Sequence, residues 1–265
     1  AIKACLRIAG ARVGDLDRLA VNFTEDSGRA DLVSMLLRGR PVSTLLGLDA
    51  SVDTSPRALL RCLLEHELGE TLPEERFAFV RHHLTHAMSA FVPSGFERAL
   101  VVTMDGQGED ESGYVATADE RGIEVLSTTP VRDSIGLLYT HITLFLGFKH
   151  HDEYKVMGLA PYGDPSVYRG AFKELYTLTP EGTYTIHNDR LITFVAEMKP
   201  RRRGDPFEQR HKDIAASLQE SVEAIAFHVL EHYRRATGMT SLCIAGGVGH
   251  NCTLNGKILG SKLFS

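Results

Sequence analysis

The sequence predicts an α/β protein with mixed sheets, and three observations lead to this fold class. Three apolar, β-branched stretches, "ALVVTMD", "SGYVATAD" and "GIEVLSTTPV", are separated by glycine-rich and acidic turns, as in an antiparallel meander. A long amphipathic helix is expected over residues 212–238. It leads into "SLCIAGGVGHNCTLNGKIL", the pattern of a buried strand, a glycine turn and a new helix. Elements in this order pack in layers around mixed sheets.

The first part of the chain is expected to alternate short helices and strands. We expect a helix to about Ala9 and then a strand at "RLAVNF". Residues 30–70 have helical spacing that is broken by glycine and proline, at Gly39, Pro41 and Pro56. The stretch "FAFVRHH" has the composition of a strand and leads into a helix that begins near His83. The packing side of this helix carries Ala87, Ala90 and Phe91.

After the meander, the sequence predicts mostly helices. "IGLLYTHITLFLGF" predicts a buried helix, "KHHDEYKVMGLAPYGDP" a loop, and "GTYTIHNDRLITF" a second hairpin. The long helix over residues 212–238 closes on two arginines and Gly238, as helix C-termini do. We expect one subdomain at residues 1–95 and a second at residues 96–265.

Composition and charge make nucleic acid and membranes poor candidates as partners. The net charge of −5 disfavours binding to a phosphate backbone, which needs a basic surface. The basic run Arg201–Arg203 is interpreted as a solvated loop, with anion binding as the alternative. Four scattered cysteines favour reduced thiols in a cytoplasmic protein. No apolar run reaches the roughly 18 residues that a membrane span needs, and no signal peptide opens the chain.

Two histidines and a carboxylate form a candidate metal site. His82 and His86 are at i and i+4, so they project from one face of a helix. The spacing is that of HExxH, but Leu84 and Thr85 fill the middle, which disfavours a metalloprotease. Asp105 ends an apolar strand immediately before a glycine. Such a set suits Fe(II) or Zn(II) with positions left open for a substrate. The alternatives are a pair of ordinary polar histidines and a turn-forming aspartate.

Two glycine turns are candidates for binding an anion or a nucleotide. Gly106 and Gly108 in "DGQGED" allow close approach of backbone N–H groups, although the acidic residues that follow would repel a bare phosphate. Gly246 and Gly247 lie between a strand and a helix that begins near Asn251. The alternatives are tight packing of strand on helix for the glycines and a helix cap for Asn251.

Other polar residues carry weaker signals. Lys155 could hold a substrate anion or pair with a neighbouring carboxylate. His150 and His151 are expected to be solvated loop residues, and Tyr139 and His141 to be packing residues of the preceding helix.

Five stretches in a fixed order resemble one family. They are "HHLTHAMSAF", "MDGQGEDESG", "IGLLYTHITLFLGF", "DEYKVMGLAPYGDP" and "AGGVGHNCTLNGK". In this order they resemble the O-carbamoyltransferases, which include nodulation-factor, cephamycin, tobramycin and ansamycin-type enzymes. The resemblance runs from about residue 76 onward, and residues 1–75 are less distinctive.

The resemblance implies an actin/Hsp70-like ATPase fold with two β-sheet subdomains flanked by helices. In the family, an adenylate-forming domain that follows this one makes carbamoyl adenylate from carbamoyl phosphate and ATP. The first domain binds the adenylate with a metal and transfers the carbamoyl group to a hydroxyl. By resemblance His82, His86 and Asp105 match the metal ligands. The nucleotide-binding turns match Gly106, Gln107, Gly246, Gly247 and Asn251.

The chain departs from the family pattern at both ends. We expect it to lack an initial hairpin with a catalytic histidine, a later aspartate ligand, and the adenylate-forming domain. The fragment alone is therefore expected to be inactive. The general base is not identified, with Lys155 as the one candidate for a catalytic residue, and the role of His250 is open.

The predicted function is ATP- and metal-dependent carbamoyl transfer to a hydroxyl of a small natural product in antibiotic biosynthesis. The expected metal is Fe(II), with zinc or magnesium as alternatives. The expected partners are the nucleotide, the hydroxyl acceptor and the adenylate-forming domain. Two other functions stay open, which are a transferase for tRNA threonylcarbamoyladenosine and a non-catalytic nucleotide-binding module.

Overall fold

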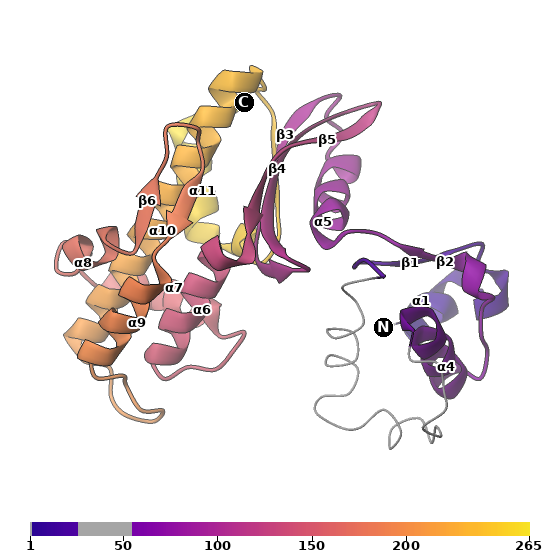
Figure 1. Ribbon diagram of the computed structural model, residues 1–265, viewed down its shortest axis with the longest axis horizontal. Helices are drawn as coiled ribbons and strands as arrows, with labels where there is room; N and C mark the ends of the chain where they lie inside the picture. The colour runs from indigo at the N-terminus through magenta and orange to yellow at the C-terminus, as the bar shows by residue number, and fades with distance from the viewer. Residues whose placement is uncertain (1, 26–54) are drawn as a thin grey trace. The chain divides into compact units, whose positions relative to one another are not determined.

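The computed structural model describes residues 2–25 and 55–265, in two compact units (Figure 1). The units are residues 1–85 and 86–265, and each is described by itself. The division falls inside helix α5 (His82–Phe91), which is continuous. Helices and a four-stranded sheet together make a mixed α/β protein, as predicted. The boundary expected near residue 95 stays a prediction.

The described residues of the first unit include two short strands and the helices α1 and α4. Helix α1 (Ile2–Ala9) ends at the predicted residue, and β1 (Leu19–Val21) pairs in parallel with β2 (Phe77–Phe79). Helix α4 (Pro56–Leu68) has the Ser55 side chain as its N-cap, and Pro56 is its first residue. The expected break in helical spacing at Pro56 agrees with this helix start, where proline loses no hydrogen bond. Gly39 and Pro41 lie outside the described residues.

The second unit is built on a sheet in the order β5-β4-β3-β8. The three predicted meander strands are β3 (Ala99–Gly108), β4 (Glu111–Asp119) and β5 (Gly122–Pro130), and they pair antiparallel. Strand β8 (Leu242–Ala245) adds to β3 in parallel. The predicted meander and the predicted strand after the long helix are therefore confirmed, although only Cys243 of β8 is buried.

Helices cover both faces of this sheet (Figure 1). Leu100, Val102 and Met104 of β3 belong to the main core with α6 (Ile135–Phe145) and α10 (Gln209–Thr237). Ala99 and Val101 face the other way, into a smaller cluster with α5. Successive side chains of a strand alternate between faces, so a strand covered on both sides is apolar throughout.

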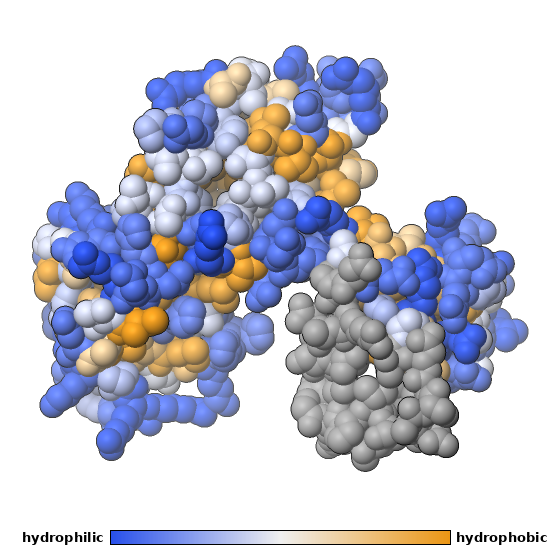
Figure 2. Space-filling view, viewed as in Figure 1, coloured by the Kyte–Doolittle hydropathy of each residue, from blue (hydrophilic) through white to orange (hydrophobic). Residues whose placement is uncertain are grey.

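The edge strand β5 is less covered than β3. Its residues Val125 and Leu126 are both exposed, at 42% and 41%. Figure 2 shows an apolar patch near this edge of the sheet, and further apolar patches lie elsewhere on the visible face. Within the described residues no helix is both long and apolar enough to cross a membrane. The four cysteines are free thiols, as expected.

The loop expected over "KHHDEYKVMGLAPYGDP" contains helix α7 (Glu153–Leu159), so this prediction is wrong. Val156 is fully buried and Ala160 is nearly so, which is the i, i+4 spacing of a helix packed on one face. Asp152 closes the preceding turn, because its carboxylate accepts from the N–H of Lys149 at 3.1 Å and pairs with Lys155 at 2.7 Å. The polar residues at the start of this segment and the proline near its end predict a loop, but packing against the core stabilises a short helix between them.

The second hairpin lies one strand earlier than expected. Strands β6 (Tyr176–Leu178) and β7 (Tyr184–Ile186) form it, and the segment after β7 is helix α9 (Asn188–Glu197). Leu191 and Phe194 are buried at helical spacing, so the apolar residues of this segment follow a helical rather than an alternating period. The remaining helices are α8 (Arg169–Lys173) and α11 (Cys252–Ser261), and α10 ends on Gly238 in the left-handed region as predicted.

His211 in the first turn of α10 predicts a pH-dependent stability. Its Nδ1 accepts from the N–H of Glu208 at 2.9 Å, and its Nε2 makes no hydrogen bond within the described chain. Burial lowers the pKa of His211 from its ordinary value of 6.5, because the ring is only 2% exposed. The folded state therefore binds fewer protons than the unfolded chain. Stability is full above that ordinary value and falls as the pH drops through it toward the folded-state pKa.

We expect the free energy of unfolding, measured with urea, to fall by about 1 kcal/mol on acidification from about pH 7.5 to about pH 5.5, as the N-terminal cap is lost. His211→Gln is the control, because glutamine at this position can accept the same N–H without titrating. The same pH dependence in both proteins would contradict the assignment.

Candidate metal centre and adjoining pocket

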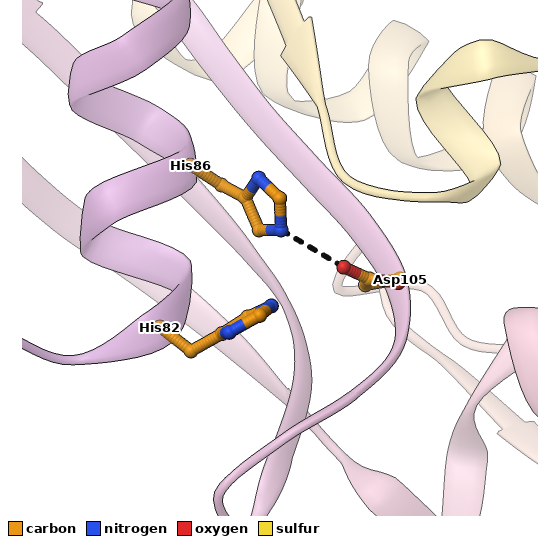
Figure 3. A group of neighbouring side chains, drawn as sticks. All are labelled: His82, His86 and Asp105. Atoms are coloured by element: carbon orange, nitrogen blue, oxygen red, sulfur yellow. Dashed lines mark hydrogen bonds and ion pairs between the residues drawn. The ribbon is translucent and has the colours of Figure 1, made fainter. Parts of the chain in front are cut away.

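Helix α5 carries both predicted histidine ligands. His82 and His86 are one turn apart, and residues at i and i+4 lie on the same side of a helix. Ala87 is fully buried against the sheet and anchors the helix there. The two imidazoles project together toward the end of β3 (Figure 3).

Asp105 lies where the buried part of β3 ends. The residues from Ala99 to Met104 are buried, whereas Asp105 and Gly106 are partly exposed. Regular pairing with β4 stops at Met104. Asp105 Oδ1 accepts from the N–H of Gly106 at 2.7 Å, which fixes one carboxylate oxygen. The Ser134 hydroxyl donates to the Asp105 carbonyl at 3.0 Å and holds the backbone beside α6.

The structure brings these three residues together. His86 Nε2 lies 2.9 Å from Asp105 Oδ2. One ligand atom of each of His82, His86 and Asp105 lies within 4.8 Å of the other two (Figure 3). Across residues 2–25 and 55–265 this is the one group of at least three His, Cys, Asp or Glu side chains with such spacing. Metal binding by the group stays a prediction.

A pocket of about 520 Å³ adjoins Asp105. The last part of β3, helices α6 and α7, the loop between these helices, and the turn after β8 line it. Its polar lining residues are Asp105, Gln107, Tyr139, Thr140, His150, His151, Glu153, Tyr154, His250 and Asn251. The predicted metal ligand Asp105 and the predicted nucleotide turns are therefore parts of one surface.

Gly246 and Gly247 let the turn after β8 approach the end of β3. Gly246 has a φ of +91°, and a Cβ there would overlap the carbonyl oxygen of Met104. A Cβ on Gly247 would lie 2.9 Å from Asp105 Oδ1. Gly247 lines the pocket, as do Gly106 and Gln107, but Gly246 does not. The close packing that was the alternative interpretation is thus present, and nucleotide binding by these turns stays a prediction.

Asn251 is the N-cap of α11, as its alternative interpretation stated. Its Oδ1 accepts from the N–H of Leu254 at 3.0 Å and from Gln219 Nε2 at 3.1 Å. Its Nδ2 donates to Gln219 Oε1 at 2.8 Å. Although Asn251 lines the pocket, its amide is thus engaged by protein groups on both of its polar atoms.

Lys155, the candidate catalytic residue, pairs with Asp152. The hydrogen bond that the Lys155 ammonium donates to the Asp152 carboxylate raises the pKa of Lys155, which keeps the ammonium charged. Lys155 is not among the residues that line the pocket. This geometry matches the alternative of a pair with a neighbouring carboxylate.

Four other predictions can be compared with the structure. His150 and His151 are exposed loop residues as expected, and they also line the pocket. Tyr139 is buried, but His141 is exposed, so the packing role predicted for His141 is wrong. The helix turns that side chain away from the core. In the basic run, Arg201 donates to the Leu146 carbonyl at 2.8 Å, which makes it structural.

The buried polar residues of α10 were not predicted from the sequence. Gln219 and Glu223 are 4% and 6% exposed, one turn apart, and Gln219 contacts Asn251 and Tyr139 at the pocket. The sequence does contain a signal for them. Two polar residues at i and i+4 on the apolar side of an amphipathic helix indicate buried, hydrogen-bonded side chains.

Comparison with known proteins identifies the family. Residues 58–265 match the family model described as the carbamoyltransferase N-terminus. Nodulation protein NolNO of Sinorhizobium fredii is 46% identical over 264 residues, which are 99% of this chain and 38% of that protein. Nodulation protein NolO of Bradyrhizobium diazoefficiens is 51% identical over 186 residues, 70% of this chain and 34% of that protein.

A more distant relative is the tRNA N6-adenosine threonylcarbamoyltransferase of Neisseria meningitidis, at 25% identity over 254 residues, 94% of this chain and 62% of that protein. The chain spans little more than a third of the two nodulation proteins. The family match covers most of the chain, from α4 to the end of the sequence. The chain belongs to the carbamoyltransferase N-terminus family.

Proposed function

We propose that this chain is the transfer domain of a metal-dependent O-carbamoyltransferase, which moves a carbamoyl group from carbamoyl adenylate to a hydroxyl of a small molecule. The observation that carries the proposal is the group of His82, His86 and Asp105, of which Asp105 also lines a pocket, in a chain of the carbamoyltransferase family. The actin/Hsp70-like fold is part of the same proposal. The similarity to the tRNA threonylcarbamoyltransferase is compatible with it.

The donor set fits a divalent ion. Ligands at 2.0–2.2 Å from an ion are at most about 4.4 Å apart, so atoms within 4.8 Å need only small side-chain rotations. Two imidazoles and one carboxylate suit Fe(II) or zinc, whereas magnesium, the other alternative, prefers oxygen ligands and fits this set less well. A bound divalent ion supplies Lewis acidity and holds anionic oxygens in place.

The chain's own residues would bind and orient the substrates. Asp105 and the imidazoles of His82 and His86 hold the ion, and the backbone around Gly106 and Gly247 fixes the phosphate side of the nucleotide. Lys155 is a poor proton acceptor, because its pair with Asp152 keeps it protonated. It supports the turn at the pocket instead.

The acceptor and the donor domain belong to the intact protein. The relatives at 46% and 51% identity are named nodulation proteins, which favours a small molecule of the nodulation system over an antibiotic as the carrier of the hydroxyl. An adenylate-forming domain elsewhere in the protein would supply carbamoyl adenylate from carbamoyl phosphate and ATP.

The test is transfer of labelled carbamoyl from carbamoyl phosphate, with ATP and Fe(II), by the intact protein. We expect label in small hydroxylated acceptors and loss of transfer when chelator is added. Nucleotide binding without any transfer to a panel of acceptors would favour a non-catalytic module.

A second candidate is a transferase for tRNA, favoured by the 25% identity to the tRNA N6-adenosine threonylcarbamoyltransferase. The net charge of −5 opposes it, because RNA binding needs a basic surface. We expect no specific tRNA binding in a filter assay at about 150 mM salt. Binding that resists this salt concentration, with label in tRNA, would reverse the order of the two candidates.

A further inference from the structure

Five side chains behind the pocket form one continuous hydrogen-bonded series. They come from three helical elements, and they are Tyr139, Gln219, Glu223, Asn251 and Lys257. The Tyr139 hydroxyl donates to Gln219 Oε1 at 3.2 Å, and Gln219 Nε2 donates to Glu223 Oε1 at 2.9 Å. Lys257 Nζ lies 2.5 Å from Glu223 Oε2. The Glu223 side chain is 7% exposed and that of Lys257 is 58% exposed, so the series runs from the pocket to the surface.

The direction of the hydrogen bonds is set at the two ends of the series. Glu223 is a carboxylate paired with an ammonium, and a carboxylate only accepts. The amide NH₂ of Gln219 must therefore face Glu223, which turns Oε1 toward Tyr139 and toward Asn251 Nδ2. At the other end the backbone N–H of Leu254 can only donate, so Asn251 Oδ1 faces it. Both ends require the same orientation of the two amides.

The series holds two walls of the pocket. Tyr139 of α6 and Asn251 at the start of α11 both line it, whereas Gln219, Glu223 and Lys257 do not. Burial, with a further contribution from the charge of Glu223, raises the pKa of Tyr139, so its hydroxyl stays protonated and donates. A ligand in the pocket would therefore contact the aromatic ring of Tyr139, while the Tyr139 hydroxyl stays hydrogen-bonded to Gln219.

We propose that Glu223 is a positioning residue of the pocket. Its carboxylate, neutralised by Lys257, fixes the amide of Gln219 and through it holds Tyr139 and the Asn251 cap. Removing the partner of a buried carboxylate destabilises the folded state. The ion pair with Lys257 at the surface therefore stabilises the position of Glu223, and Glu223 in turn fixes Gln219. The proposal rests on the proposed function in one respect, which is that the pocket binds a nucleotide.

Glu223→Gln in the intact protein tests the proposal. Both oxygens of Glu223 accept, one from Gln219 and one from Lys257, whereas glutamine has one oxygen and one NH₂. One of these two contacts therefore sets a donor against a donor, and the amide of Gln219 is then held only from the Leu254 end. We expect amide hydrogen exchange in the peptide that contains Leu254 to become about tenfold faster, and the calorimetric dissociation constant of ATP to rise about tenfold. Lys257→Met is a second variant, at a residue whose side chain is 58% exposed. It should raise both the exchange rate at Leu254 and the ATP dissociation constant. Lys257→Arg keeps the positive charge and should leave both at the values of the unsubstituted protein.

Glu220→Gln is the matched control. Glu220 lies on the same helix and pairs with Arg169 at 2.8 Å, outside the series. It should change neither quantity. Unchanged exchange at Leu254 in Glu223→Gln and Lys257→Met would overturn the proposal, and so would faster exchange with an unchanged ATP dissociation constant. If the unsubstituted protein binds no ATP, the proposed function is contradicted, and exchange alone decides whether Glu223 positions the two walls.

Discussion

Replacing Asp105 by Asn or His82 by Ala is expected to abolish the proposed metal binding and to slow the proposed carbamoyl transfer about 1000-fold or more. Losing the Lewis acid raises the activation barrier by several kcal/mol, and each 1.36 kcal/mol is tenfold in rate. In Asp105→Asn the amide side chain keeps an oxygen for the N–H of Gly106, so the turn is preserved while the anionic ligand is lost. Metal content per protein, measured by mass spectrometry after dialysis, reports the ligand role independently of the rate.

Two substitutions control for the loss of a charge or of an imidazole elsewhere. Asp119→Asn removes a carboxylate at the end of β4 that pairs with Arg121 at 2.7 Å, and His66→Ala removes an exposed imidazole on α4. Both should retain metal and rate. Unchanged metal content and rate in Asp105→Asn would end the ligand assignment.

Replacing Gly246 by Ala is expected to destabilise the protein by about 3 kcal/mol. A φ of +91° is strained for any residue with a Cβ, and this Cβ would overlap the Met104 carbonyl oxygen in the core of the sheet. Relief requires the turn to move away from β3, which also displaces the pocket wall beside Asp105. Urea unfolding of the two proteins measures the difference.

Gly256→Ala is the control, because Gly256 lies inside the neighbouring helix α11 with nothing within 4 Å of a Cβ. Alanine there should stabilise by about 0.5–1 kcal/mol. A similar loss of stability in both variants would indicate a general sensitivity to glycine substitution instead of a close approach at Gly246. A Gly246→Ala protein as stable as the unsubstituted one would contradict the close approach.

Much of the second unit could be predicted from sequence because its signals are local. The meander depends on three β-branched runs with turns between them, and α10 on an apolar stripe that repeats with a helical period. The errors arose where local signals conflict. Helix α7 begins in a polar turn and ends two residues before Pro161, and α9 follows a strand whose apolar residues continue into the helix. In both cases burial of one side against the core decided the conformation.

The sequence by itself determined that His82 and His86 share a helix face and that Asp105 ends a buried strand, because periodicity is a property of neighbouring residues. Only the tertiary structure decided that α5 packs where its imidazoles meet that carboxylate. It also decided that Gln219 reaches Asn251, 32 residues away, and that Gly246 contacts β3. Such contacts depend on sheet register and on helix packing. One local sequence pattern is compatible with many registers and packing arrangements, so it does not determine these contacts.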